Sequence, residues 1–304
     1  MSSQTGLKVS LRRNVPLAQY TTMQVGGPAH YFAEPTGEEE LLEILELARE
    51  EGLSFTVLGK GSSCIFPDEG YPDLVITMLQ YQKDHMVFDT THQQVTASGG
   101  VHLYRLALAC RDHGLGGAEF LSGIPGTLGG ALFMNAGFSR FPNQMNEIGD
   151  LVEEVTVLGF DGRKKLLYRR DLEFSYRKSN LRECFALGAK LQLWRRSAEE
   201  IEREMKANFE YRNTKQDLRY PSSGSIFKNP APPHPSAGKL IESTGLKGVQ
   251  SGGIKVSQKH GNYFVKVGPA KSTDVVQLIE KVQKAVFDAT KIYLEPEVRI
   301  VPKS

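Results

Sequence analysis

The chain has 304 residues, of which 40% are hydrophobic and 24% charged, a composition typical of globular proteins. Its formal net charge of +2 lacks the strong, clustered basicity of nucleic-acid-binding domains, so nucleic acid is not an expected partner. No apolar run approaches the ~18 residues of a membrane span, and residues 1–14 contain no apolar leader segment, so we expect a soluble cytoplasmic protein without a membrane partner.

The first predicted element is an amphipathic helix over residues 38–51. Its apolar side chains recur at helical spacing, acidic residues occupy the first turn, and Gly52 follows as a stop. An apolar β-type run at 53–58 leads into a glycine-rich turn. The same alternation returns at 95–117, where a predicted strand is followed by a helix over 102–113. Such alternation favours an α/β or α+β fold over an all-β sandwich.

Strands predominate in residues 151–195, with a hairpin turn predicted at Asp161-Gly162. A helix begins after Ser197, because Ser197 and Glu200 have the spacing of a capping box. We therefore expect a domain boundary near residue 196. It separates a first part, 1–195 with its core at about 20–195, from a C-terminal domain, 196–304.

The C-terminal part has helical apolar spacing at 236–244 and 272–289, with a strand-like run at 262–268 between them. The two parts differ in charge. Residues 196–304 carry 18 Lys and Arg against 12 Asp and Glu, whereas residues 1–195 carry 19 against 23, which gives +6 and −4. A basic C-terminal part can attract an anionic small molecule.

Two segments are rich in glycine. In GIPGTLGGALFMNAG at 123–137, closely spaced glycines allow a ligand to approach the backbone, and successive N–H groups can bind an anion such as diphosphate. The spacing matches neither G-x-G-x-x-G nor a P-loop, so a purely structural loop is an equal alternative. The segment VLGKGSSCIF at 57–66 offers glycines and two hydroxyls in the same way, with a weaker signal.

Ser225 lies in YPSSGSIFKNP at 220–230. The motif is not G-x-S-x-G, so the sequence does not indicate a nucleophile elbow. Lys228 and Asn229 suit an anionic or amide-bearing ligand, although a simple turn into a strand is the competing interpretation.

Two further motifs carry charged groups that could act in a site. Glu295 and Glu297 share a face if YLEPEVRIV is extended, but most such carboxylates are solvated. Tyr176 and Arg177 in SYRKSN read equally well as a solvated basic turn.

Three cysteines without a CxxC motif, Cys64, Cys110 and Cys184, predict reduced thiols. The seven histidines show no metal-ligand spacing, and we expect no metal.

Taken together and in this order, the motifs resemble the UDP-N-acetylenolpyruvoylglucosamine reductases. The match runs from YTTMQVGGPAHYF at 20–32, through VLGKGSS, GIPGTLGGALFMNAG, SYRKSN and GSIFKNP, to GNYFVKVG and LEPEVRIV. The resemblance implies an α+β protein: a FAD-binding part of the vanillyl-alcohol-oxidase (PCMH) type, then a smaller α+β substrate-binding domain. The expected boundary near 196 agrees with it.

The resemblance also implies a reaction. NADPH reduces non-covalently bound FAD, which passes hydride to C3 of the enolpyruvyl group of UDP-N-acetylglucosamine enolpyruvate, and the product is UDP-N-acetylmuramate for peptidoglycan synthesis. The serine that protonates C2 in such enzymes falls on Ser225. Arg177 is implied to hold the developing carboxylate charge, and Glu297 to act as an acid or to polarise the intermediate.

The FAD contacts implied by the resemblance lie in the two glycine-rich segments: Gly59, Gly61, Ser62, Ser63, Gly123, Pro125, Gly126, Gly129, Gly130, Asn135, Ala136 and Gly137. The implied substrate contacts are Tyr176, Arg212, Lys215, Lys228 and Asn229. Ser63 stands where the family commonly has asparagine, and we expect this difference to affect FAD affinity rather than the chemistry. The chain resembles the shorter form of the family, without the insertion whose tyrosine loop closes over substrate.

Two alternatives stay open. Another flavoprotein of the same fold, an oxidase or dehydrogenase, would share the glycine segments but has no reason to carry GSIFKNP and PEVR together. A non-catalytic nucleotide-sugar binder would have no need of Ser225, Arg177 and Glu297. The sequence fixes neither NADPH over NADH nor the oligomeric state, and a monomer is compatible with it.

Overall fold

The computed structural model describes residues 11–141 and 145–301. The first ten residues, for which the sequence predicts no apolar leader, lie outside the described residues. Contacts between residues divide the chain into two compact units. The first unit contains the chain up to Asn14, His30–Gly59 and Asp73–Phe209, and the second contains Val15–Ala29, Lys60–Pro72 and the chain from Glu210.

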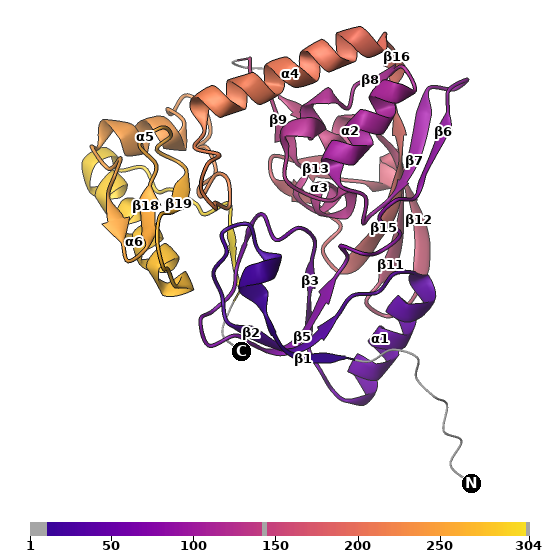
Figure 1. The fold of residues 1–304 in the computed structure, drawn as a ribbon, viewed down its shortest axis with the longest axis horizontal. Helices are drawn as coiled ribbons and strands as arrows, with labels where there is room; N and C mark the ends of the chain where they lie inside the picture. Colours follow the sequence, from indigo (N-terminus) through magenta and orange to yellow (C-terminus); the bar gives the residue numbers. More distant parts are fainter. Residues whose placement is uncertain (1–10, 142–144, 302–304) are drawn as a thin grey trace. The chain divides into compact units, whose positions relative to one another are not determined.

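A five-stranded antiparallel sheet forms the centre of the first unit, in the order β12-β11-β15-β7-β6 (Figure 1). Its strands are β6 Met86–Asp89, β7 Gln94–Ser98, β11 Val152–Gly159, β12 Lys164–Tyr168 and β15 Cys184–Gln192. Along β15, buried residues alternate with partly exposed ones, as expected for a strand with one face on the core.

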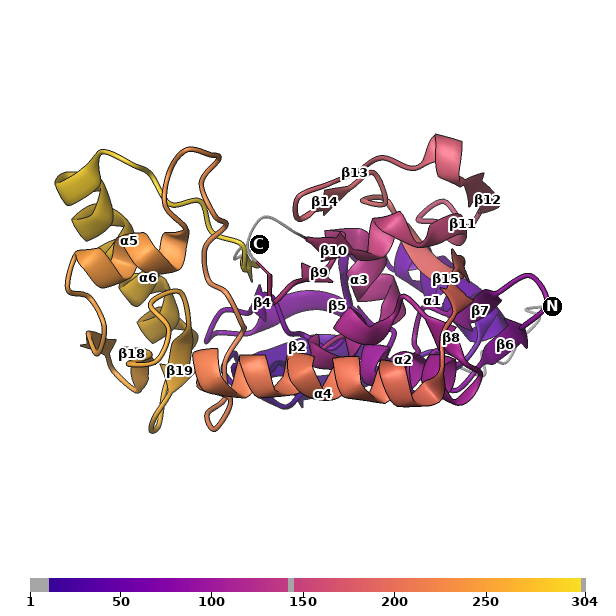
Figure 2. The same cartoon turned by 90° about the horizontal axis from the view of Figure 1, so that it is seen from above.

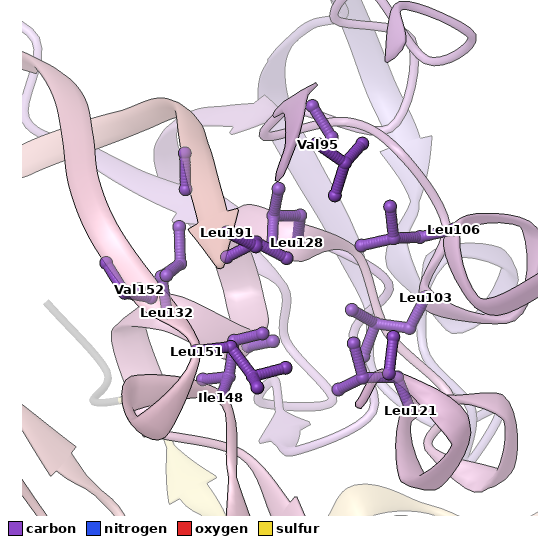
Figure 3. Close-up of a cluster of buried hydrophobic side chains, with 14 of the residues drawn as sticks. Val95, Leu103, Leu106, Leu121, Leu128, Leu132, Ile148, Leu151, Val152 and Leu191 are labelled. Carbon is purple, nitrogen blue, oxygen red and sulfur yellow. The ribbon is translucent and has the colours of Figure 1, made fainter. Parts of the chain in front are cut away.

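Two helices, α2 (Leu103–Asp112) and α3 (Leu128–Met134), pack against this sheet. Figure 3 shows their leucines meeting side chains of the sheet in one buried cluster, with Leu103 and Leu128 among them. The helix predicted over 102–113 is thereby confirmed as α2.

The predicted helix over 38–51 is α1 (Glu38–Glu50). Its apolar stripe is buried, together with residues of β5 (Tyr71–Thr77), in a second core of this unit. β5 runs parallel to β3 (Phe55–Leu58), in a four-stranded sheet ordered β1-β2-β5-β3. The remaining strands of this sheet are β1 Arg12–Pro16 and β2 Pro28–Ala33.

Short elements connect the larger ones. They are η1 Leu17–Tyr20, β4 Cys64–Ile65, β8 Leu115–Gly116, η2 Glu119–Gly123, β9 Gly137–Phe138, β10 Asn146–Glu147, η3 Ile148–Asp150, η4 Arg169–Asp171, β13 Phe174–Ser175, β14 Lys178–Ser179 and β16 Trp194–Arg195.

Helix α4 (Ala198–Lys215) begins at the predicted capping box. The Ser197 N–H donates to Glu200 Oε2 at 3.1 Å, and the Glu200 N–H donates to Ser197 Oγ at 3.3 Å. Ile201 and Met205 of α4 bury their side chains with Ala107 of α2, inside the first unit. The division between the two units falls within this helix, after Phe209.

In the second unit, helices α5 (Ala237–Ser243) and α6 (Ser272–Thr290) lie beside a small antiparallel sheet (Figures 1 and 2). The sheet order is β17-β18-β19, with β17 Gln250–Ser251, β18 Ile254–Val256 and β19 Phe264–Lys266. A separate pair joins β20 (Arg299–Ile300) to β4 in parallel. The buried side chains of this unit include Met23 and Ile65, so the early segments are part of its core.

Helices and sheets in both units confirm the predicted α+β class. Within residues 11–141 and 145–301, no helix is long and apolar enough to cross a membrane.

Candidate functional site

Ser225 follows a tight turn whose shape requires a glycine. Gly224 has φ of 71°, in the left-handed region that favours glycine, and its N–H donates to Ser222 Oγ at 3.2 Å. Ser225 then forms an isolated antiparallel bridge with Tyr263. The serine is therefore partly buried at the start of an extended segment with a fixed backbone.

Glu297 lies on the other side of that segment. The Glu297 N–H donates to Ile226 O at 2.7 Å, and the Lys228 N–H donates to Glu295 O at 2.9 Å. The segment around Glu297 thus runs alongside the residues that follow Ser225. Sequence alone placed these two residues 72 positions apart, and the second unit brings their backbones together.

The two glutamates of this motif have different surroundings. Glu295 pairs with Lys228, with 2.6 Å between Oε1 and Nζ, and its side chain is 65% exposed. Glu297 is partly buried. Of the two glutamates, the partly buried Glu297 is the one that the resemblance implies to act in the site.

The first glycine turn belongs to the same framework. The Thr22 N–H donates to Gly61 O at 3.2 Å, and the Ser222 N–H donates to Thr22 O at 3.1 Å, so Thr22 joins the glycine turn to the Ser225 turn. On its other side the Arg299 N–H donates to Ser63 O at 2.7 Å. The turn, Ser225 and Glu297 are thus held by one set of hydrogen bonds within the second unit.

Gly61 cannot be replaced by a larger residue without a shift. Its φ is 65°, and a Cβ at this position would lie 2.0 Å from Tyr20 O. The amides of Gly61, Ser62 and Ser63 make no backbone hydrogen bond with other described residues. Three successive amides with two adjacent hydroxyls fit an anion such as the pyrophosphate of a dinucleotide.

Cys64 follows this turn. Burial raises the pKa of its thiol to about 11, and the nearby charge of Arg299 only partly offsets that effect. The thiol therefore stays protonated at neutral pH, which suits the expected reduced cysteine.

The second glycine segment lies in the first unit and is more helical than its sequence suggests. Helix α3 begins at Leu128, whose N–H donates to Val101 O at 2.9 Å, and the Gly129 N–H donates to Gly99 O at 2.8 Å. A Cβ on Gly129 would lie 3.1 Å from Ala186 O. This glycine allows α3 to pack closely on the sheet, and its amide already has a protein acceptor.

Gly130 differs from Gly129. A Cβ on Gly130 would have one described side-chain atom nearby, Thr127 Oγ1 at 3.5 Å, so a ligand can approach this position. A Cβ on Gly59 would lie 3.0 Å from the same Oγ1 and 3.9 Å from Gly130 Cα. The end of β3 and the start of α3 therefore meet, which brings residues of both predicted glycine segments together.

Asn135 ends α3 in the left-handed conformation, with φ of 45°. Its Nδ2 donates to Glu147 Oε2 at 2.7 Å and to Ser175 O at 3.2 Å, while its Oδ1 accepts from the Gly149 N–H at 3.0 Å. The side-chain amide thus holds the hairpin β13–β14 against the end of α3. Gly123, Pro125 and Gly126 precede α3, and Ala136 and Gly137 follow Asn135.

Tyr176 and Arg177 form the two-residue turn of that hairpin, between the paired Ser175 and Lys178. Arg177 has φ of 56°, which non-glycine residues seldom adopt and which often marks a functional position. One guanidinium nitrogen donates to Gly137 O at 3.3 Å, and the guanidinium carbon lies 4.9 Å from the centre of the Tyr176 ring. The arginine is partly buried at the end of the glycine segment.

The predicted substrate residues of the second unit occupy two places. Arg212 and Lys215 lie in the last turn of α4, where Arg212 Nε donates to Gln216 Oε1 at 2.7 Å. Asn229 lies beside Lys228, and its Oδ1 accepts from the Ala237 N–H at 3.1 Å, at the start of α5. Asn229 therefore has a structural role, and its contact with substrate stays a prediction.

Two features of this framework were missed by sequence reasoning: the linking role of Thr22 and the buried side chain of Asn262, which is 3% exposed. Both lie in motifs that support the family resemblance, YTTMQVGG and GNYFVKVG. A buried asparagine is uncommon, but burial is not visible in a single sequence.

Comparisons with known proteins agree with this arrangement. Residues 29–164 match an FAD binding domain, and residues 216–301 match the UDP-N-acetylenolpyruvoylglucosamine reductase C-terminal domain. The UDP-N-acetylenolpyruvoylglucosamine reductase of Bacillus subtilis is 38% identical over 95% of this chain and 93% of its own length. The enzyme of the same name from Anoxybacillus flavithermus is 37% identical over 96% and 94%.

A solved structure gives the same result. The crystal structure of UDP-N-acetylenolpyruvylglucosamine reductase from Thermus caldophilus is 35% identical, with a TM-score of 0.79 over 96% of this chain and 100% of that chain. An FAD-binding part followed by a C-terminal domain, as the sequence predicts, is therefore confirmed. The chain belongs to the UDP-N-acetylenolpyruvoylglucosamine reductase family.

Proposed function

We propose that the protein catalyses the NADPH-dependent reduction of UDP-N-acetylglucosamine enolpyruvate to UDP-N-acetylmuramate. Family membership supports the reaction, and FAD supplies the chemistry by accepting hydride from NADPH and passing it to the substrate. The structural observation that carries the proposal is the hydrogen bond from the Glu297 N–H to Ile226 O, which holds the two predicted proton-handling residues in adjacent segments.

Reduction adds hydride at C3 of the enolpyruvyl double bond and one proton at C2, so the C=C bond becomes a single bond and no group leaves. We assign the proton to the Ser225 hydroxyl, which regains one from water before the next turnover. A hydroxyl is a weak acid, so it serves only a strongly basic carbon at a fixed position. The bridge to Tyr263 fixes the backbone of Ser225 and thus supports this role.

Negative charge develops on the enolpyruvyl group before the proton arrives. We assign its stabilisation to Arg177, whose fork of donors matches the substrate carboxylate better than a lysine ammonium. Glu297 acts beside Ser225 as an acid or by polarising the intermediate. Its partly buried position supports this assignment.

For FAD, we assign the pyrophosphate to the amides of Gly61, Ser62 and Ser63, because these donors have no described backbone acceptor. The segment 123–137 contributes further backbone contacts at its uncovered positions, such as Gly130. Arg212, Lys215 and Lys228 provide positive charge for the nucleotide sugar.

We infer that the C-terminal domain from residue 196 carries most of the substrate contacts and that the enzyme works in the cytoplasm, where NADPH and the nucleotide sugar are available. The oligomeric state is not fixed by the sequence, and a monomer is compatible with it. Gel filtration tests the monomer. An elution volume matching twice the 33.7 kDa of the chain would contradict it.

The proposal is tested by visible absorbance of the purified protein under anaerobic conditions. NADPH should bleach the flavin band, and UDP-N-acetylglucosamine enolpyruvate should restore it. Bleaching without recovery would indicate a different flavoprotein oxidase or dehydrogenase. A protein without a flavin spectrum after FAD is added, but with affinity for the nucleotide sugar, would indicate a binder.

Ser225→Ala separates the two half-reactions. Bleaching by NADPH should proceed at the wild-type rate, whereas recovery on adding substrate should slow by about 100-fold, within the range of general acid catalysis. Ser243→Ala is a matched control, because the Ser243 hydroxyl bonds to Leu240 O of its own helix. If the flavin band of Ser225→Ala recovered at the wild-type rate, Ser225 would not be the proton donor.

A further inference from the structure

We infer that Asn262 is a positioning residue for catalysis, because its side-chain amide fixes the backbone segment that presents Ser225. The inference rests on the proposed role of Ser225 and deepens it. Asn262 is in the second unit, as is Ser225, and its side chain is remote from solvent at 3% exposure.

The amide of Asn262 brackets one residue of the catalytic segment. Its Nδ2 donates to Phe227 O at 2.7 Å, and its Oδ1 accepts from the Phe227 N–H at 2.9 Å. Its backbone carbonyl accepts from the Ile226 N–H at 3.0 Å. Three hydrogen bonds thus connect Asn262 to the two residues that follow Ser225.

These bonds are needed in the local geometry. Phe227 is fully buried, so its N–H and C=O would lack water if Asn262 did not bind them, and an unsatisfied buried polar group costs about 1–3 kcal/mol. Ile226 O already accepts from the Glu297 N–H. The segment is therefore held both by Asn262 and by the segment that contains Glu297.

Asn262 is itself fixed. Its N–H donates to His260 Nδ1 at 3.1 Å, and a Cβ on Gly238 of α5 would lie 3.1 Å from His260 Cε1. Burial lowers the pKa of His260, so the ring is neutral at pH 7 and its Nδ1 can accept this hydrogen bond. The Asn262 amide is thus connected through the planar ring of His260 to helix α5.

The chemistry of the bracket selects asparagine. One planar group must accept from the N–H and donate to the C=O of the same residue. A carboxylate can accept but cannot donate, and a leucine of similar volume can do neither. A proton donor must be held within ~0.5 Å of its productive position. The Asn262 bracket supplies this constraint two residues from Ser225.

The test uses the FAD-containing enzyme with NADPH and UDP-N-acetylglucosamine enolpyruvate in anaerobic stopped flow. Asn262→Ala should leave flavin reduction by NADPH within about 2-fold of wild type and slow flavin reoxidation by substrate by about 10- to 100-fold, the loss expected from misplacing a catalytic group. Asn262→Asp keeps the acceptor for the Phe227 N–H, so its rate of flavin reoxidation should lie between the rates of wild type and Asn262→Ala.

A structural control is Gln192→Ala. Gln192 Nε2 also donates to backbone carbonyls, His92 O at 3.0 Å and Leu193 O at 3.1 Å, but in the first unit. Both half-reactions of this variant should match wild type. Parallel loss of both half-reactions and of flavin content in both Asn262 variants would show a merely structural role and overturn the inference.

A double-mutant cycle identifies the residue through which Asn262 acts. If it positions Ser225, Asn262→Asp should cause no further loss of reoxidation rate in a Ser225→Ala background. An additive loss, or wild-type reoxidation in both Asn262 variants, would overturn the positioning role while Ser225→Ala remains slow. Normal reoxidation in Ser225→Ala would instead overturn the proposed proton donor, and the inference with it.

Discussion

Three residues of the candidate site have left-handed backbone. Gly61 and Gly224 adopt this conformation at the two turns that Thr22 joins, and Arg177 adopts it at the tip of its hairpin. For the glycines the conformation is free of Cβ strain, whereas for Arg177 it costs free energy that the surrounding contacts must offset. Strain at an arginine is consistent with selection for its position.

Gly61→Ala should reduce FAD binding. An added Cβ meets Tyr20 O at 2.0 Å, so the turn must shift and its amides move with it. We expect about 1–3 kcal/mol of lost stability and substoichiometric flavin, measured by absorbance after dialysis. Gly52→Ala is the control, because Gly52 has a φ of 63° but no atom within 4 Å of the added Cβ. Equal flavin content in both variants would contradict the assignment.

Arg177→Lys should retain flavin and its reduction by NADPH but slow reoxidation by substrate. A lysine keeps the charge and loses the fork of donors, and removing one donor at a developing anion typically costs about 100- to 1000-fold. Single-turnover reoxidation measures the effect. Arg195→Lys, at an exposed guanidinium that donates to Thr90 O, should behave as wild type. A wild-type rate in Arg177→Lys would exclude the proposed role.

Helix α6 illustrates how distant segments complete an element. Its first amides, those of Ser272 and Thr273, donate to the Asp68 carboxylate at 2.6 and 3.0 Å. Asp68 lies 204 residues earlier in the chain, in the segment that also carries the first glycine turn. The carboxylate thus caps α6 and ties that segment to the core of the second unit.

Asp68→Ala should lower stability by about 1–2 kcal/mol, the usual effect of removing a helix cap. Burial raises the Asp68 pKa, but hydrogen bonds from Thr273 and Ser272 outweigh it and leave the pKa below its ordinary value of 3.8. The contribution of the Asp68 cap to the free energy of unfolding is therefore present above pH ~4. It disappears as pH falls through the lowered pKa of Asp68 in the folded state.

Urea denaturation of wild type and Asp68→Ala between pH 7 and 3 measures this difference. Asp288→Ala, at an exposed ion pair with Lys284 in the same helix, should leave the free energy of unfolding close to that of wild type. If the difference in free energy of unfolding between wild type and Asp68→Ala grew as pH fell, the predicted direction of the pH dependence would be wrong.

The two units of the chain have separate cores. The cluster around α2 and α3 and the cluster around α5 and α6 contain side chains of different units, so we expect the two units to unfold in separate transitions. The amides of Gly61, Ser62 and Ser63 have no backbone acceptor among the described residues, so they remain available to a ligand or to water.

Removal of FAD should lower the melting temperature. A cofactor that binds only the folded state stabilises it by RT ln(1 + [L]/Kd), about 2.7 kcal/mol at 100 times Kd. Calorimetry of apo-protein and of apo-protein with added FAD measures the shift. Gly61→Ala apo-protein should respond less to the same FAD concentration, and an identical response would argue against the Gly61 turn as part of the FAD site.

The sequence by itself determined the local helices and strands and the candidate residues of the site. Apolar spacing located α1, α2 and α6, and a capping box located the start of α4, because these signals depend on residues within a few turns of one another. The motifs also named Ser225, Arg177 and Glu297 as candidates. Helix α3 was the exception, since Gly129 and Gly130 disfavour a helix and only packing on Gly99 and Ala186 explains it.

The tertiary structure alone decided which segments meet. Residues 15–29 and 60–72 join the second unit, and residues 295–298 run beside 226–228, across separations that no local pattern encodes. These contacts put the backbone of Glu297 beside the residues that follow Ser225, and they connect the side chain of Asn262 to Phe227. The physical reason is that long-range pairing depends on burial and on hydrogen-bond partners, which exist only once the chain has folded.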